Sequence, residues 1–326
     1  MSHRRYALSA VILFIIVGLT AGCGSSDAQG GTTVETGGTG QTNSPTGGAS
    51  TAGGSTQAGS TGGTATSTSV GSSTSSKFSF FVTSQARLFA LASAYNGSTK
   101  GFGGDLRYGE TGTGAGLRGA DKICTQIAEA SSPGNGKTWR AFLSATTDGT
   151  AQVDAINRIG SGPWYDRLER LLANTTTELL NTRPTAAHAT IINDFPNEDG
   201  VPNHDALQSG NTTNQDNHDI LTGTSATGTL HKATATCSDW TSSAGSSSQK
   251  PRCGHSWPAG AGGGGIGMGG GSMSNWMSAL DEAGCAPGYN LAESVNGQPS
   301  TPGSDGTLSV GSGGGYGAIY CFALTP

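Results

Sequence analysis

Apolar residues along this chain fall into short runs separated by long polar stretches, and the runs predict several brief strands. Residues 78–84 (Phe-Ser-Phe-Phe-Val-Thr-Ser) are rich in aromatic and β-branched side chains, which is typical of an opening strand. Residues 138–144 predict a second strand, with two aromatic side chains in the core. Residues 218–224 predict a further strand-like segment, and residues 316–324 predict the final core strand.

A helical period occurs at residues 117–128. The apolar positions there are i, i+3, i+6, i+7, i+10 and i+11, which predicts an amphipathic helix with Cys124 on its buried side. The glycine-rich loop before it contains no Gly-Lys-Ser/Thr, so the sequence does not support a phosphate-binding loop. Shorter elements are also predicted: a helix at 153–159, extended pieces at 164–165 and 170–173, and a helical turn capped by Thr177 that carries Leu179 and Leu180.

Residues 235–242 (Ala-Thr-Cys-Ser-Asp-Trp-Thr-Ser) combine a cysteine with one of the five tryptophans of the chain. The segment has two interpretations, a nucleophile site or a structural clamp. As a clamp, it is predicted to be a strand in which Trp240 fills the core beside Cys237. What the other cysteines do decides between the two interpretations.

Composition limits how much of the chain can fold. Of 326 residues, 55 are glycine, and only 33% are hydrophobic and 12% charged. We therefore expect a signal segment, a disordered linker and one loop-rich domain of roughly 250 residues. The net charge of -5 provides no basic surface, which argues against nucleic acid as a partner.

The N-terminus resembles a bacterial lipoprotein signal. Residues 3–5 (His-Arg-Arg) are basic, residues 7–19 are apolar, and small residues precede Cys23. The apolar run is shorter than the approximately 20 residues of a membrane-spanning helix. Cys23 is therefore the expected lipid attachment site, although Thr20 stands where such signals prefer leucine. Gly24 favours the outer membrane; the alternative is ordinary secretion with an incidental Cys23.

Residues 24–76 are almost entirely Gly, Ser, Thr, Ala and Gln, and cannot bury enough surface to offset their ordering entropy. They predict a flexible tether. The expected organisation is a signal peptide at 1–22, a lipidated cysteine and linker at 23–77, and one folded domain at 78–326.

A polar segment at residues 184–219 holds most of the candidate site chemistry. Its acidic residues and histidines are His188, Asp194, Glu198, Asp199, His204, Asp205, Asp216, His218 and Asp219. Asp194, Glu198, Asp199 and Asp205 are candidate calcium ligands, although no complete twelve-residue calcium loop is present. No histidine pair has the helical spacing of a zinc site. The alternatives are a solvated surface loop and a catalytic metal.

Five cysteines follow the lipid candidate: Cys124, Cys237, Cys253, Cys285 and Cys321. Export makes disulfides the default, and four paired cysteines allow three pairings. Cys253 has two interpretations. Arg252 and His255 could lower the pKa of an exposed thiol that then joins a second chain, or the thiol could be without a role.

An ordered series of motifs resembles the bacterial endostatin-like lipoprotein family, found mainly in spirochaete surface lipoproteins, which has a C-type-lectin-like fold. The motifs are residues 80–84 (Phe-Phe-Val-Thr-Ser), 119–124 (Gly-Ala-Asp-Lys-Ile-Cys), 139–144 (Trp-Arg-Ala-Phe-Leu-Ser), 220–224 (Ile-Leu-Thr-Gly-Thr), 237–242 (Cys-Ser-Asp-Trp-Thr-Ser), Cys285 and 320–322 (Tyr-Cys-Phe). The resemblance implies a single α+β domain with Cys124 joined to Cys321, Cys237 joined to Cys285, and Cys253 unpaired. Cys237 then becomes a disulfide partner rather than a nucleophile.

The resemblance also shows what this chain lacks. Lectins of this fold that bind sugar through calcium use Glu-Pro-Asn or Gln-Pro-Asp together with Trp-Asn-Asp. Here Gln298-Pro299-Ser300 lies after Cys285 and carries no acid, so calcium-dependent sugar binding is not transferred. Relatives are associated with host matrix and complement proteins, but no contact residues carry over.

The leading functional hypothesis is a lipid-anchored envelope protein whose lectin-like head binds an extracellular protein or glycan. Its partners would be the membrane, through the lipid, and that ligand. One alternative is a structural envelope component; another is a secreted hydrolase that uses the polar segment at residues 184–219, which alanine at Asp199, His204 and His218 would test. No residue is assigned a catalytic role, because neither Gly-x-Ser-x-Gly nor His-Glu-x-x-His occurs.

Overall fold

The computed structural model describes residues 77–203, 218–257, 275–289 and 307–325. The chain divides into two units, Met1–Ser67 and Thr68–Pro326, and every described residue belongs to the second. The expected signal segment, Cys23 and the tether up to residue 76 lie outside the described residues. Among the helices that are described, none is long and apolar enough to cross a membrane.

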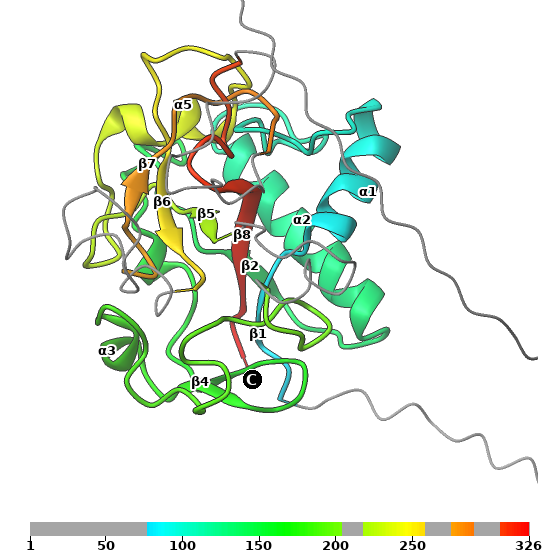
Figure 1. Ribbon diagram of the computed structural model, residues 1–326, viewed down its shortest axis with the longest axis vertical. Helices are drawn as coiled ribbons and strands as arrows, with labels where there is room; N and C mark the ends of the chain where they lie inside the picture. The colour runs from blue at the N-terminus through cyan, green and yellow to red at the C-terminus, as the bar shows by residue number, and fades with distance from the viewer. Residues whose placement is uncertain (1–76, 204–217, 258–274, 290–306, 326) are drawn as a thin grey trace, which may run out of the picture. The chain divides into compact units, whose positions relative to one another are not determined.

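The described residues form an α+β arrangement rich in loops (Figure 1). The strands are β1 (Phe80–Val82), β2 (Trp139–Ala141), β3 (Trp164–Tyr165), β4 (Leu171–Ala173), β5 (Asp219–Leu221), β6 (Arg252–His255), β7 (Leu280–Asp281) and β8 (Gly315–Ala323). The helices are α1 (Gln85–Asn96), α2 (Ala115–Ser131), α3 (Thr176–Leu179) and α5 (Cys237–Trp240), with 3-10 turns η1 (Ala155–Asn157) and η2 (Ala233–Ala235).

β8 organises the main sheet, whose order is β1-β8-β5-β6-β7. The second half of β8 pairs antiparallel with β1 along one edge and with β2 along the other. Its first half pairs in parallel with β5, and β6 then pairs antiparallel with β5. Figure 1 shows β8 in the middle of the molecule, with α1 and α2 to one side and β6 and β7 to the other. β3 and β4 form a separate two-stranded sheet.

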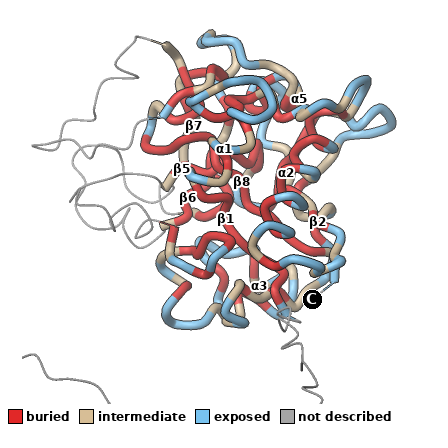
Figure 2. The backbone as a smooth tube through the Cα atoms, turned by 90° about the vertical axis from the view of Figure 1, so that its right-hand side faces the viewer, coloured by how far each residue is buried: buried red, intermediate tan, exposed pale blue. Residues whose placement is uncertain are grey.

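The core lies around β8, and all nine of its residues are buried (Figure 2). Tyr320 and Phe322 contact an aromatic group from distant parts of the chain, which consists of Phe80, Phe142, Trp164, Phe195 and Trp276. Each such ring removes a large apolar surface from water, so a glycine-rich chain obtains its core from relatively few side chains.

Two disulfides join distant segments: Cys124 of α2 to Cys321 of β8, and Cys237 of α5 to Cys285. These are the pairings that the family resemblance implies. Cys253 is unpaired and buried.

Most of the predicted elements lie where the pattern puts them, but α1 was missed. The prediction placed only a strand and a glycine-rich loop between residues 78 and 116. Because α1 buries only Leu88 and Ala92, it has no helical stripe of apolar residues that a sequence pattern could reveal. Its signals are local: the side chain of Ser84 caps the first turn, and Gly97 ends the helix at a φ of 76°.

Two predictions about short helical turns and strands were wrong. The cap of α3 is Thr175, whose side chain accepts a hydrogen bond from Glu178 N, rather than Thr177. The predicted strand at 235–242 is instead a left-handed turn, because residues 237–240 have φ values of 48°, 56°, 56° and 64°. Trp240 donates its indole N–H to the carbonyl oxygen of Ser144 at 2.8 Å, and Cys237 must reach Cys285. The turn meets both requirements, whereas a strand would direct the two side chains differently.

Candidate functional site

Glu198, one of the four candidate calcium ligands, holds the start of α1 instead. Its Oε1 accepts a hydrogen bond from Ser84 Oγ at 2.5 Å, and its Oε2 accepts one from Ser84 N at 2.9 Å. Burial raises the pKa of Glu198, and the two hydrogen bonds from Ser84 act in the opposite direction. Both oxygens of this carboxylate are therefore used to order the helix N-terminus.

The other three candidate calcium ligands do not form a metal-binding group with Glu198 in the described part of the chain. Asp194 is half-buried and Asp199 is exposed on a turn, whereas Asp205 lies outside the described residues. In the described ranges, only one group of three or more His, Cys, Asp or Glu side chains could hold a metal ion, and it contains none of these residues. The geometry of the described part of the polar segment thus does not support a calcium site.

That group is His218, Asp219 and His255, which we call the His-Asp-His cluster. Asp219 begins β5 and His255 ends β6, and the antiparallel register places them directly opposite each other. Nε2 of His218 lies 3.2 Å from Oδ1 of Asp219, and the His218 ring stacks on the His255 ring with centroids 3.7 Å apart. One potential ligand atom from each residue lies within 4.8 Å of the others.

Glu282, just after β7, brings a second carboxylate to the cluster. A Cβ built on Gly313 would lie 2.8 Å from Asp219 Oδ2 and 3.4 Å from Glu282 Oε2, so both carboxylates face this glycine. Asp219 is 0% and Glu282 1% exposed. Burial raises the pKa of Asp219 well above its ordinary value, with a further contribution from Glu282, and burial raises the pKa of Glu282 to about 7.

Cys253 lies two residues before His255 on β6. Burial raises the pKa of its thiol, and the nearby carboxylates of Glu282 and Asp219 raise it further, whereas Arg252 acts in the opposite direction. A buried thiol with a raised pKa is a poor nucleophile and cannot reach a second chain. The structure therefore favours the interpretation of Cys253 as an inert buried thiol.

Sequence reasoning found only part of this cluster. It included His218 and Asp219 in the polar segment, but treated His255 only as a neighbour of Cys253 and did not consider Glu282. The three parts are separated by long stretches of chain, and the pairing of β5 with β6 brings them together. A usable signal was the placement of charged residues beside apolar strand positions, because a buried strand tolerates charge only where it is compensated.

A separate pocket of about 310 Å³ lies beside the end of α1. Tyr95 is 49% exposed, and its ring meets that of Tyr108 at a centroid distance of 5.0 Å. Phe102 packs edge-on against Tyr108 at 5.5 Å. Asp105 and Arg107 form a two-point ion pair in the lining, with N–O distances of 2.8 and 2.6 Å. We call this the Tyr95 pocket; it combines aromatic faces with charged groups.

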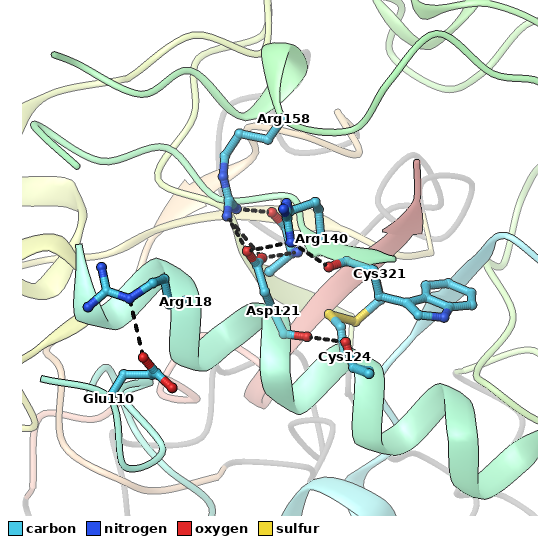
Figure 3. A network of polar contacts seen from close by, with 10 residues as sticks. Glu110, Arg118, Asp121, Cys124, Arg140, Arg158 and Cys321 are labelled. Carbon is cyan, nitrogen blue, oxygen red and sulfur yellow. Dashed lines mark hydrogen bonds and ion pairs between the residues drawn. A yellow bond between two sulfur atoms is a disulfide. The ribbon is translucent and has the colours of Figure 1, made fainter. Parts of the chain in front are cut away.

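A second hollow of about 500 Å³ is lined by arginines, and Figure 3 shows its polar network. Arg158 donates to both carboxylate oxygens of Asp121 at 2.9 Å, and Arg140 lies 3.4 Å from the same carboxylate. The amide of Ala141 also donates to Asp121, which ties α2 to β2. Arg118 pairs with Glu110 and with two backbone carbonyls. Because the chain itself provides acceptors for these guanidinium groups, we assign the network to the fold.

Ser238 and Asp239, which raised the question of a nucleophile, belong to the left-handed turn. Asp239 accepts hydrogen bonds from Thr146, and Thr236 Oγ1 contributes another at 3.2 Å. Its carboxylate thus joins two loops.

Comparison with known proteins adds no relative: no family model matches the chain, and no curated protein matches it.

Proposed function

We propose that this chain is an envelope lipoprotein whose folded head binds a glycan without modifying it. The lipoprotein-like N-terminus, the glycine-rich stretch up to residue 76 and the ordered motifs support an anchored head with a C-type-lectin-like, endostatin-like fold. The α+β arrangement, with its last strand at the centre and α2 joined to it through Cys124 and Cys321, is consistent with that assignment.

The observation that carries the glycan proposal is the Tyr95 pocket. A sugar ring has C–H groups on its faces and hydroxyl groups around its edge. An exposed aromatic ring matches the faces, and fixed charged groups such as Asp105 and Arg107 match the hydroxyls. The volume lies at the lower end of the roughly 300–1,000 Å³ typical of ligand pockets, which suits one or two sugar units.

The mode of binding that we propose is independent of calcium. The sequence lacks the tripeptides through which lectins of the similar fold hold calcium and sugar together. Glu198, one of the four candidate calcium ligands, instead accepts a hydrogen bond from Ser84 at the start of α1. The charged groups of the Tyr95 pocket instead pair with each other. No cation is therefore needed to hold Asp105 and Arg107 in place.

The test is binding of the purified full-length protein in detergent to an array of envelope and host glycans, with and without EDTA. We expect a retained signal in EDTA, and at least a tenfold loss of affinity in Tyr95→Ala, equivalent to about 1.4 kcal/mol. Tyr289→Ala is the matched control, because Tyr289 is 47% exposed but does not line the pocket.

Three results would overturn the proposal. Equal affinity of the Tyr95→Ala protein would remove the pocket from the binding site. Absence of any glycan signal, with only a loss of surface integrity on deletion of the protein, would favour a structural envelope component. Release of shortened glycan products by the wild-type protein would instead favour the hydrolase.

A further inference from the structure

Two neighbouring strands place an unusual set of side chains in the interior. Asp219 and His255 are paired across β5 and β6, and His218 precedes Asp219. All three residues contribute a potential ligand atom to a space in which these atoms lie within 4.8 Å of one another. His255 is 2% exposed, so this is an interior arrangement rather than a surface group of polar residues.

The burial and hydrogen bonding of the Asp219 carboxylate provide a second, independent observation. Both of its oxygens are buried, and neither makes a geometrically well-formed hydrogen bond in the described part of the chain; Nε2 of His218 lies 3.2 Å from Oδ1. Glu282, also buried, adds a second carboxylate whose Oε1 makes no such hydrogen bond either. Two carboxylates in a dry interior need a proton shared between them or a cation beside them.

Arg252, which lies on the same strand as His255, does not neutralise these carboxylates. Arg252 of β6 directs its guanidinium to Ser278 Oγ at 2.9 Å and to Asp281 at 3.1 Å. In the described part of the chain, the imidazole of His218 remains beside Asp219, and a bound cation would complement it.

We propose that His218, Asp219 and His255 bind one divalent transition-metal ion of the zinc class, with the carboxylate of Glu282 as the fourth ligand. Imidazole nitrogens together with carboxylate oxygens suit zinc and its neighbours in the first transition row. Calcium is disfavoured because it selects sets of six to eight oxygen ligands.

For His218, Asp219 and His255, the geometry requires only side-chain movement. Adjacent ligands of a tetrahedral zinc ion lie roughly 3.4 Å apart, because each metal–nitrogen bond is about 2.0–2.1 Å long. The 4.8 Å limit of the His-Asp-His cluster is wider, so side-chain rotation must close it. The stacked rings of His218 and His255 must also splay, because each has to point a nitrogen at the ion.

A metal at this position would have a structural effect. The ligands come from β5, β6 and the residue after β7, so one ion would connect three consecutive strands of the sheet. Binding to the folded state alone stabilises that state by mass action. The proposed site is independent of the Tyr95 pocket, with which it shares no residue.

The test uses the untagged full-length protein in detergent, stripped with EDTA and dialysed. Zn²⁺ is titrated in competition with a chromophoric chelator, Co²⁺ is followed by its visible absorption, and the melting temperature is measured with and without Zn²⁺. We expect one ion per chain, an intense Co²⁺ spectrum typical of a four-coordinate site, and a higher melting temperature with Zn²⁺.

Variants then locate the site. His255→Gln, His218→Gln and Glu282→Gln should each weaken Zn²⁺ binding at least tenfold, whereas His188→Gln, at an exposed histidine outside the cluster, should bind as the wild type does. If His255→Gln fails to fold, His218→Gln and the wild-type Co²⁺ spectrum still test the proposal.

The proposal is overturned if the wild-type protein binds neither Zn²⁺ nor Co²⁺, which would leave a shared proton between Asp219 and Glu282. It is also overturned if His218→Gln and Glu282→Gln bind Zn²⁺ as tightly as the wild type does, which would place the ion elsewhere.

Discussion

Asp239 accepts hydrogen bonds from both the backbone nitrogen and the hydroxyl of Thr146, which lies 93 residues earlier in the chain. The N–Oδ1 distance is 2.6 Å. This contact holds the left-handed turn of α5 against the loop after β2. Asp239, in a segment for which a nucleophile site was one interpretation, thus connects two loops.

Removing that connection should destabilise the fold. Asp239→Ala leaves the donors of Thr146 without their acceptor, and we expect a loss of about 1 to 3 kcal/mol in the free energy of unfolding. The measurement is urea denaturation followed by tryptophan fluorescence. Ser238→Ala is the control, since the Ser238 side chain is exposed; a change within about 0.5 kcal/mol is expected there. Equal effects of the two variants would contradict the assigned role of Asp239.

The backbone of the same turn leads to a second prediction. Ser238 has a φ of 56° and a ψ of 52°, a left-handed conformation that costs a non-glycine residue roughly 1–2 kcal/mol. Ser238→Gly removes this cost, and because glycine also loses more entropy on folding, we expect a net stabilisation of up to about 1 kcal/mol. Ser93→Gly, at an exposed position inside α1, should act in the opposite direction. Thermal unfolding of both variants tests this difference in sign.

The two disulfides should differ in their contribution. Cys124 and Cys321 are 197 residues apart, whereas Cys237 and Cys285 are 48 apart. On the chain-entropy model the longer loop contributes about 5 kcal/mol and the shorter about 4 kcal/mol. Paired Cys→Ala variants, compared by denaturant unfolding, should therefore show the larger loss for the Cys124 and Cys321 pair. The reverse order would show that native packing, rather than loop closure, sets their contribution.

Glu198 should make stability depend on pH. Burial outweighs the hydrogen bonds from Ser84 and raises the folded-state pKa of Glu198 above its unfolded value. A raised pKa means that this contribution is fully present below the unfolded pKa and is lost as the pH rises through the folded pKa. Relative to Glu198→Gln, the wild-type protein should therefore lose stability as the pH rises above the ordinary range of glutamate.

The measurement for Glu198 is the free energy of unfolding of both proteins across that pH range. Glu129→Gln serves as the control, because Glu129 is an exposed glutamate elsewhere in the domain. A wild-type curve that runs parallel to that of Glu198→Gln would contradict the burial effect.

The local pattern of apolar residues was sufficient to predict the helices and strands whose side chains face the core at regular intervals. The helical stripe at residues 117–128 lies within α2, and the apolar run at 316–324 contains most of β8. In these segments the burial of one side is decided by residues a few positions apart. The prediction of which cysteines pair came from the family resemblance, because four paired cysteines allow three pairings and the residues alone did not choose among them.

Long-range contacts decided the rest. The cap of α1 is local, but Ser84 is itself held by Glu198, which lies 114 residues away and therefore outside any window of sequence around the helix. The left-handed turn at Cys237 exists because a disulfide, the indole of Trp240 and the carboxylate of Asp239 each have a distant partner.

The sequence by itself determined which segments could contribute to the hydrophobic core and which cysteines could form disulfides between them. It also showed which region was too polar to pack into the core. Only the tertiary structure decided where charge would enter the interior. His255 meets Asp219 through the register of β5 against β6, and Glu282 arrives with β7. Strand register is set by the packing of the whole sheet, because a shift of one residue would turn these side chains to the opposite face.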